Sequence, residues 1–246
     1  MAQKSSLVAL FAAAIVGFSC GASATEFPTK EFIPAATYNW TGCYGGVSGG
    51  AGMESDWWTG TTGSDLRGLG GLAGGQLGCN YQMGWLVAGI EGEGYWSSLR
   101  NSFSEYSGPT SFETWTTRNP YNFDVAARFG LAFDRAFFYG KGGVVFGRFD
   151  FANTGVGTAP PGAFAASGSA TLPGLLLGLG LEYGLTPHWT AKMEYDFLGF
   201  SATTIGFTCV GAGCTTTAFN LSPGATEQVF KLGLNYKFDS LPGATR

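Results

Sequence analysis

The sequence predicts an all-β protein, an eight-stranded antiparallel up-and-down transmembrane β-barrel. Three observations support this fold class. Only 12% of the 246 residues are charged, about half the share of an ordinary soluble domain, while the chain holds 41 Gly and 21 Phe. Beyond the N-terminus there is no run of about 20 apolar residues of the kind a membrane-spanning helix needs. From Trp40 onward, segments of alternating apolar and polar residues are separated by connectors that are short and long in turn.

The first 24 residues have the pattern of a cleaved signal peptide. Lys4 precedes an apolar stretch over residues 7–18, and small residues at 22–24 form the expected cleavage site. The mature chain would then begin with a periplasmic segment over residues 25–40. The alternative is a lipoprotein anchored through Cys20, which the residues preceding that cysteine disfavour.

Eight segments with period-2 hydrophobicity are the predicted strands of the barrel, residues 41–238. They are 41–54, 68–81, 85–97, 121–133, 137–149, 172–184, 189–200 and 227–238. The predicted short turns are 82–84, 134–136 and 185–188, and the predicted long connectors are 55–67, 98–120, 150–171 and 201–226. Short turns belong on the periplasmic side and long loops outside. With both termini in the periplasm, the connectors match an eight-stranded barrel, and residues 239–246 form a periplasmic tail.

Each predicted strand has one face suited to lipid and one suited to a packed lumen. In segment 189–200, for example, Trp189, Met193 and Phe197 alternate with Lys192, Glu194 and Asp196. Aromatic residues near the strand ends are expected at the two membrane interfaces. They are Trp40, Tyr44, Trp85, Tyr95, Trp96, Trp189, Tyr236 and Phe238.

Four stretches carry a resemblance to a known family: YNWTGCY at 38–44, GIEGE at 89–93, LAFDR at 131–135 and GLEYGLTPHW at 180–189. They resemble the porin-like small outer-membrane proteins of alphaproteobacteria, which are similar in architecture to eight-stranded OmpA-type barrels. The resemblance implies an outer-membrane location. It implies little about activity, because members are variously described as structural envelope proteins, minor porins and surface antigens.

The last predicted strand contains a second pattern, which the family resemblance identifies as a candidate assembly signal. Lys231, Gly233, Tyr236 and Phe238 resemble the polar-x-glycine-x-x-aromatic-x-aromatic signal by which the barrel-assembly machinery recognises a final strand through β-augmentation. In the family the last aromatic usually ends the chain, whereas here residues 239–246 follow.

Charged residues on the inward faces are the main candidate functional group. They are Glu91, Glu93, Arg128, Lys141, Glu182, Lys192, Glu194 and Asp196. Buried charges need partners, so the simplest interpretation is a plug of ion pairs that fills the lumen. The alternative is a gate or narrow ion path in which Arg128 exchanges partners between Glu91 and Glu93.

Four cysteines remain after removal of the signal peptide, an even number in an oxidising compartment. Cys209 and Cys214 are separated by a glycine-containing stretch that lets the chain turn back, which favours a disulfide over free thiols or metal binding. Cys43 and Cys79 lie at the same periplasmic end of the first predicted hairpin. They are candidates for a second disulfide if their register matches.

Nothing in the sequence indicates catalysis, a cofactor or a metal. His188 is the only histidine, which excludes a multi-histidine metal site, and a hydrolase of the outer-membrane barrel class remains the enzyme alternative. The glycine-rich stretch 68–75 is not followed by a helix and is expected to relieve crowding inside the barrel. The net charge of −4 is spread along the chain, so nucleic acid is not an expected partner.

The function expected from these features is that of a monomeric structural protein in the outer membrane. It would contribute to envelope integrity and present loops at the surface, with membrane lipid and the assembly machinery as its partners. Two alternatives remain open: a small-solute porin, and a surface ligand-binding protein or adhesin that acts through its extracellular loops.

Overall fold

A computed structural model describes residues 38–58, 66–106, 111–158, 161–214 and 217–238. The predicted signal peptide, most of the predicted periplasmic segment and the C-terminal tail lie outside these residues. Among the described residues, no helix has the length and apolar character required to cross a membrane.

The described residues form ten β-strands. Their bounds are β1 (Gly42–Trp58), β2 (Leu66–Met83), β3 (Leu86–Tyr106), β4 (Phe112–Phe133), β5 (Ala136–Thr158), β6 (Pro161–Gly184), β7 (Trp189–Phe200), β8 (Ile205–Val210), β9 (Ala218–Leu221) and β10 (Pro223–Lys237). Period-2 alternation produces these strands, because a barrel wall needs every second side chain to point inward.

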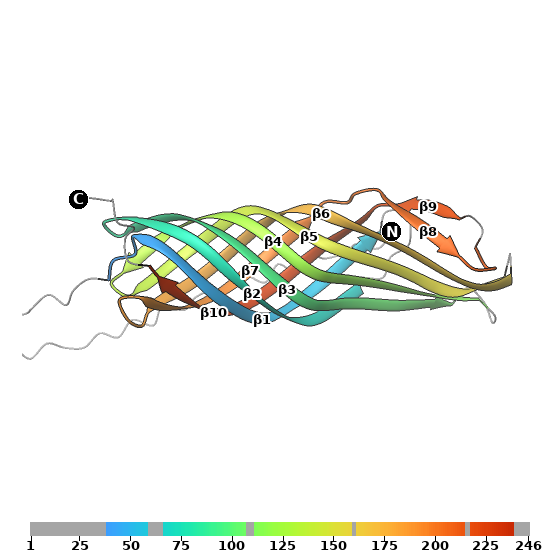
Figure 1. Cartoon of the computed structure of the whole chain (residues 1–246), viewed down its shortest axis with the longest axis horizontal. Helices are drawn as coiled ribbons and strands as arrows, with labels where there is room; N and C mark the ends of the chain where they lie inside the picture. The colour runs from blue at the N-terminus through green and yellow to red at the C-terminus, as the bar shows by residue number, and fades with distance from the viewer. Residues whose placement is uncertain (1–37, 59–65, 107–110, 159–160, 215–216, 239–246) are drawn as a thin grey trace, which may run out of the picture. The chain divides into compact units, whose positions relative to one another are not determined.

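Eight of these strands close into a ring, which confirms the predicted fold class. The first six strands pair in sequence order, β6 pairs with β7, β7 with β10, and β10 with β1, all antiparallel. Figure 1 shows the strands of the ring inclined to the long axis of the picture. The small strands β8 and β9 stand outside the ring: β8 pairs with Ala165, Ala166 and Ser167 of β6, and β9 pairs with β8 (Figure 1).

The short turns lie close to where the sequence predicts them: the third matches at 185–188, the second is 134–135, and the first is 84–85, because Gln82 and Met83 continue β2. Gly84 and Asp134 occupy the two-residue turns β2–β3 and β4–β5 with positive φ angles of 62° and 50°, as tight hairpin turns require. In the third turn, the hydroxyl of Thr186 accepts hydrogen bonds from the backbone of His188 and Trp189. These contacts hold three hairpins at the same end of the barrel, the end predicted to face the periplasm.

The long connectors differ from the prediction, because most of their residues continue the strands. Residues 98–106 and 112–120 extend β3 and β4, and residues 150–158 and 161–171 extend β5 and β6. Residues 55–58, with Trp57 and Trp58, likewise belong to β1 rather than to the first loop. In the fourth connector, residues 205–210 and 218–221 form β8 and β9. We call the extended parts of β3 to β6 the outer wall.

A β-bulge marks the base of the outer wall. The β3–β4 register shifts between Trp96 and Leu99, beside Pro120, which has no N–H to give to a ladder. Ser98 replaces the missing ladder contacts to β2: its Oγ accepts from Gly71 N at 2.9 Å and donates to Gly71 O at 3.1 Å. Ser97 donates to the carbonyl of Asn119 on β4.

The outside of the barrel is apolar and the charged residues of its membrane part lie inside, the reverse of a water-soluble protein. Ile90, Leu175 and Leu177 are 65–69% exposed, whereas the side chains of Arg128 and Glu194 are buried inside the ring. Trp85, Trp189, Tyr236 and Phe238 are exposed at strand ends, as predicted for interfacial aromatics, and Trp96 is exposed in the middle of β3, at the bulge. Trp40, Tyr44 and Tyr95 contradict that prediction: they point inward and are at most 4% exposed.

Candidate functional site in the barrel lumen

All eight predicted lumen charges lie buried inside the barrel, in one continuous layer that we call the charged layer. Arg128 on β4 connects the carboxylates of two other strands within this layer. Its Nη1 lies 3.1 Å from Glu91 Oε2 on β3, and its Nη2 lies 2.6 Å from Glu182 Oε2 on β6. Tyr139 supports it, because the guanidinium carbon lies 4.0 Å from the centre of the Tyr139 ring. The guanidinium is therefore fixed between two carboxylates and an aromatic face.

Lysines hold the remaining carboxylates. Lys141 Nζ lies 2.9 Å from Glu194 Oε1 and 3.2 Å from Glu93 Oε2. Lys192 Nζ lies 3.6 Å from Glu91 Oε1 and 3.8 Å from Glu194 Oε2. Each lysine thus contacts carboxylates from different strands, and the layer ties β3, β5 and β7 together across the lumen.

Lys231 on β10 is a central member of the charged layer, although it was predicted as part of the assembly signal and not among the eight lumen charges. Its Nζ lies 2.5 Å from Glu93 Oε2, 2.6 Å from Asp196 Oδ2 and 2.9 Å from Glu194 Oε1. Its place between Phe230 and Leu232, both lipid-facing, was the signal that could have identified it.

The layer also contains residues that the prediction missed. Asp124 on β4 lies 3.9 Å from Lys141, and the hydroxyls of Tyr44 and Tyr139 donate to Glu91 and Glu194 at 2.7 Å each. Tyr44 also accepts a hydrogen bond from Arg128. The aromatic rings inside the barrel thus carry hydroxyl groups that satisfy the carboxylates.

Glycines make room for these rings. A Cβ atom on Gly180 would lie 2.2 Å from Cζ of Tyr139, and one on Gly78 would lie 2.4 Å from the hydroxyl of Tyr44. In the stretch 68–75, a Cβ on Gly68, Gly70 or Gly74 would lie within 2.6 Å of backbone atoms of β3. Crowding inside a narrow barrel therefore accounts for these glycines.

An aromatic cap closes the lumen at the end of the barrel where the short turns lie. Trp40 is 2% exposed and packs against Phe137 at a ring-centre distance of 5.2 Å, with Tyr38 beside it at 4.7 Å. Its backbone N–H donates to Gln82 and its indole N–H donates to the carbonyl of Asp134. Burial raises the pKa of Tyr38 to about 12. The segment before β1 therefore seals the barrel from below.

An apolar cluster closes the lumen toward the opposite end, below the outer wall. Its buried members come from eight strands and include Tyr95, Val145, Phe149, Leu172, Leu176, Leu198, Phe200, Phe207 and Val229. Phe149 and Phe200 meet edge to face with ring centres 5.0 Å apart. The lumen thus has three layers: an aromatic cap, a charged layer and an apolar cluster.

The charged layer does not have the chemistry of a metal site. Oxygens of Glu91, Glu93 and Glu194 lie within 4.8 Å of one another, a spacing that would suit a cation. The ammonium groups of Lys141 and Lys231 already occupy the space beside them, at 2.5–3.3 Å. The carboxylates are neutralised by side chains of the chain itself.

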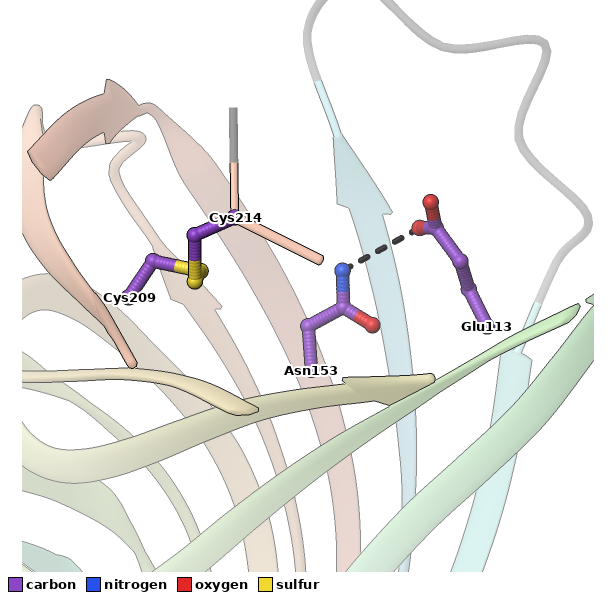
Figure 2. The surroundings of a disulfide bond; sticks show 4 residues. All are labelled: Glu113, Asn153, Cys209 and Cys214. Carbon is purple, nitrogen blue, oxygen red and sulfur yellow. Dashed lines mark hydrogen bonds between the residues drawn. A yellow bond between two sulfur atoms is a disulfide. The ribbon is translucent and has the colours of Figure 1, made fainter. Parts of the chain in front are cut away.

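Both predicted disulfides are present. Cys43 and Cys79 are directly opposite each other in the β1–β2 register, and Cys209 is bonded to Cys214 beyond β8. Figure 2 shows the second disulfide together with the hydrogen bond from Asn153 to Glu113, at 3.1 Å. Asn153 of β5, Ala166 of β6 and Cys209 of β8 are successive partners across the sheet. This disulfide therefore closes a hairpin that joins the outer wall.

The residues of the predicted assembly signal divide between the two faces of β10. Lys231 and Gly233 lie on the inner face, whereas Tyr236 and Phe238 are exposed to the lipid side. Tyr236 packs against Trp189 and His188. His188 lies in the turn between β6 and β7, and its ring is also 3.4 Å from the carbonyl of Lys237.

Comparison with known proteins agrees with this architecture. The chain is 29% identical to the 31 kDa outer-membrane immunogenic proteins of Brucella melitensis and Brucella suis, over 95% of this chain and 97% of each relative. The crystal structure of the outer membrane protein OprG from Pseudomonas aeruginosa matches 83% of this chain and all of that chain, with 13% identity and a TM-score of 0.47. Residues 10–238 match the family described as outer membrane protein beta-barrel domain. The chain therefore belongs to the outer-membrane β-barrel family and is a protein of the bacterial outer membrane.

Proposed function

We propose that this protein is a closed structural barrel that contributes to envelope integrity and presents its outer wall at the cell surface. The single observation that carries the proposal is the filling of the lumen at three successive levels. An eight-stranded barrel is only just wide enough for its own side chains, and here those side chains are large and paired. A hydrated ion would have to pass an aromatic cap, a charged layer and an apolar cluster.

The apolar cluster is the strongest argument against a small-solute porin. Hydrophobic constrictions resist wetting, and Phe149 of β5 meets Phe200 of β7 inside the lumen, over the intervening strand β6. Exchange of partners by Arg128 alone would leave this cluster closed. The gate alternative would therefore require movement in two layers that share no residue.

Surface presentation is supported by the outer wall. Strands β3 to β6 have 21 to 24 residues, roughly twice the 9–11 that a tilted strand needs to cross the membrane. The Brucella relatives are named as immunogenic, in keeping with parts exposed outside the cell. The proposed partners are membrane lipid and, during biogenesis, the assembly machinery, and the proposed state is a monomer.

Planar-bilayer recording of the refolded mature protein tests this function. The wild-type protein and Arg128→Ala are both expected to give no stepwise current, because the cap and the apolar cluster remain in both. Stepwise currents in the wild type that change in Arg128→Ala would contradict the closed barrel. Turnover of a generic ester or phospholipid by the detergent-extracted protein would contradict a non-enzymatic role.

A further inference from the structure

Two arginines face outward immediately above the lipid-facing belt. On β3, the exposed residues Ile90 and Trp96 are followed on the same face by Arg100. On β4, Arg118 follows the exposed Tyr121 when the strand is read outward from the membrane. Trp96 and Tyr121 are direct partners in the sheet, and so are Arg100 and Arg118. An aromatic pair therefore lies directly below a cationic pair.

The height of this pair corresponds to lipid headgroups. With about 3.3 Å per residue and a strand tilt of about 40°, residues 86–96 of β3 rise about 25 Å, the height of the apolar band of such barrels. Arg100 lies four residues further along the strand. The same geometry places it about 10 Å above the belt, beside the polar surface of the outer leaflet.

Neither guanidinium of the arginine pair is held in an ion pair in the described part of the chain, and the nearest carboxylate across the sheet is that of Asp150. Like charges directly opposite each other destabilise a sheet, and neither Arg100 nor Arg118 forms an ion pair among the described residues. Asp150 is the sheet partner of Arg118, but its carboxylate lies 3.2 Å from Arg148 Nε. Glu113 accepts from the inward-facing Asn153 and so lies on the other face. The surface is suited to an external anion.

Two grooves meet at the arginine pair and share both residues. The larger, of about 780 Å³, is lined by hydroxyl groups, among them those of Thr114, Thr116 and Ser169, and by Asp150, whose carboxylate is paired with Arg148. The smaller, of about 290 Å³, is lined by Trp96, Leu99 and Pro120 and lies toward the apolar belt. The arginines thus separate a polar groove above from an apolar groove below.

We propose that Arg100 and Arg118 bind the phosphate of a phosphorylated glycolipid from the outer leaflet of the membrane. Guanidinium groups form paired, charge-assisted hydrogen bonds with phosphate oxygens. The hydroxyl-lined groove receives the sugar, and the groove beside Trp96 receives part of an acyl chain. A free anion would use only the first of these features, and the lipid uses all three.

The test compares lipid binding by wild-type and variant proteins. Each protein is purified from outer membranes into zwitterionic micelles, and its lipid binding is measured by native mass spectrometry. The probes are bis-phosphorylated lipid A, the same lipid without its phosphates, and the soluble bis-phosphorylated disaccharide without acyl chains. The variants are Arg118→Glu, Trp96→Ala, and Arg135→Glu as the matched charge change at the periplasmic turn.

We expect Arg118→Glu to weaken lipid A binding at least about tenfold, whereas Arg135→Glu leaves it unchanged. The substitution gains an opposite charge beside Arg100 and a like charge beside Asp150, so the unfolding temperature of lipid-free protein is measured alongside and should stay close to that of the wild type, which separates lost binding from lost folding. Trp96→Ala should weaken binding of lipid A but not of the disaccharide.

Three results would overturn the assignment. The first is equal lipid A binding by wild type and Arg118→Glu. The second is equally tight binding of the lipid that lacks phosphates. The third is binding of the soluble disaccharide as tightly as the lipid, which would show a phosphate site that is independent of the membrane.

Discussion

Arg128 Nη2 lies 2.6 Å from Glu182 Oε2, and this contact joins β4 to β6 across the closed lumen. Glu182 is a point of convergence, since Thr190 and Asn235 also donate to its other oxygen at 2.5 and 2.9 Å. The carboxylate is therefore fully engaged by three strands. Such a contact stabilises the barrel only while every partner is in place, because a buried charge that loses its partner is costly.

Replacement of Arg128 by methionine should reduce the free energy of unfolding by about 3–5 kcal/mol, because Glu91 and Glu182 would remain buried without their shared cation. Urea titration of the protein in lipid vesicles measures this loss. Adding Glu182→Gln to the same background should recover part of it, since one uncompensated charge disappears. A double variant less stable than Arg128→Met would contradict this explanation.

Alanine at Gly180 should displace the Tyr139 ring and break its hydrogen bond to Glu194, because the new methyl would overlap Cζ at 2.2 Å. We expect a loss of about 1–3 kcal/mol, as for other overpacked sites. Gly140→Ala on β5 is the matched control, because its Cβ would meet only atoms at 3.8 Å or more. Similar unfolding midpoints for the two variants would show that crowding is not the reason for Gly180.

The two disulfides should differ in their contribution to stability. The bond between Cys43 and Cys79 closes a loop of 36 residues, whereas that between Cys209 and Cys214 closes one of 5. Chain-entropy arguments give about 4 and about 2 kcal/mol respectively. Paired Cys→Ser variants, compared by urea unfolding, test the order of the two values. The reverse order would mean that strand pairing, rather than loop length, controls the effect.

The aromatic cap should loosen at alkaline pH. Tyr38 is neutral in the folded protein up to a pKa of about 12, because its burial disfavours the phenolate. In the unfolded chain the same group ionises near its ordinary pKa of about 10. Its stabilising contribution is therefore complete below about pH 10 and is lost as the pH rises toward 12. Trp40 fluorescence would report the loosening.

Tyr38→Phe provides the control for this pH dependence. The Tyr38 hydroxyl is buried without a hydrogen-bond partner among the described residues, so its removal should not reduce stability at neutral pH. The alkaline change in fluorescence should disappear in this variant. If the change persisted unaltered, another group would be responsible for it.

The sequence predicted the membrane part of the fold well, because there the two faces of each strand have different solvents. In β7, lipid-facing Met193 and Phe197 alternate with Lys192, Glu194 and Asp196, and the observed bounds match the predicted ones. The outer wall was missed for the opposite reason. Above the membrane both faces are polar, as at Arg100, Asn101 and Ser102, and the period-2 pattern disappears although the strand continues.

Two features of the lumen could not be predicted from alternation. In β6, Leu172 and Leu176 point inward while Leu175 and Leu177 face lipid, so a run of leucines does not distinguish the faces. The apolar cluster therefore could not be predicted from the sequence. The inward direction of Trp40 depends on contacts with Gln82 and Asp134, which are distant in sequence.

The unequal lengths of the strands have a consequence for how this protein can vary. β7 ends after 12 residues and β10 has 15, whereas β5 and β6 run in an unbroken register from Ala136↔Tyr183 to Thr158↔Pro161. Residues added or removed in pairs at the tip of such a hairpin leave every pairing below them unchanged. The part of the protein that meets the outside world can therefore grow, shrink or change its sequence while the membrane-embedded cylinder keeps its pairing intact.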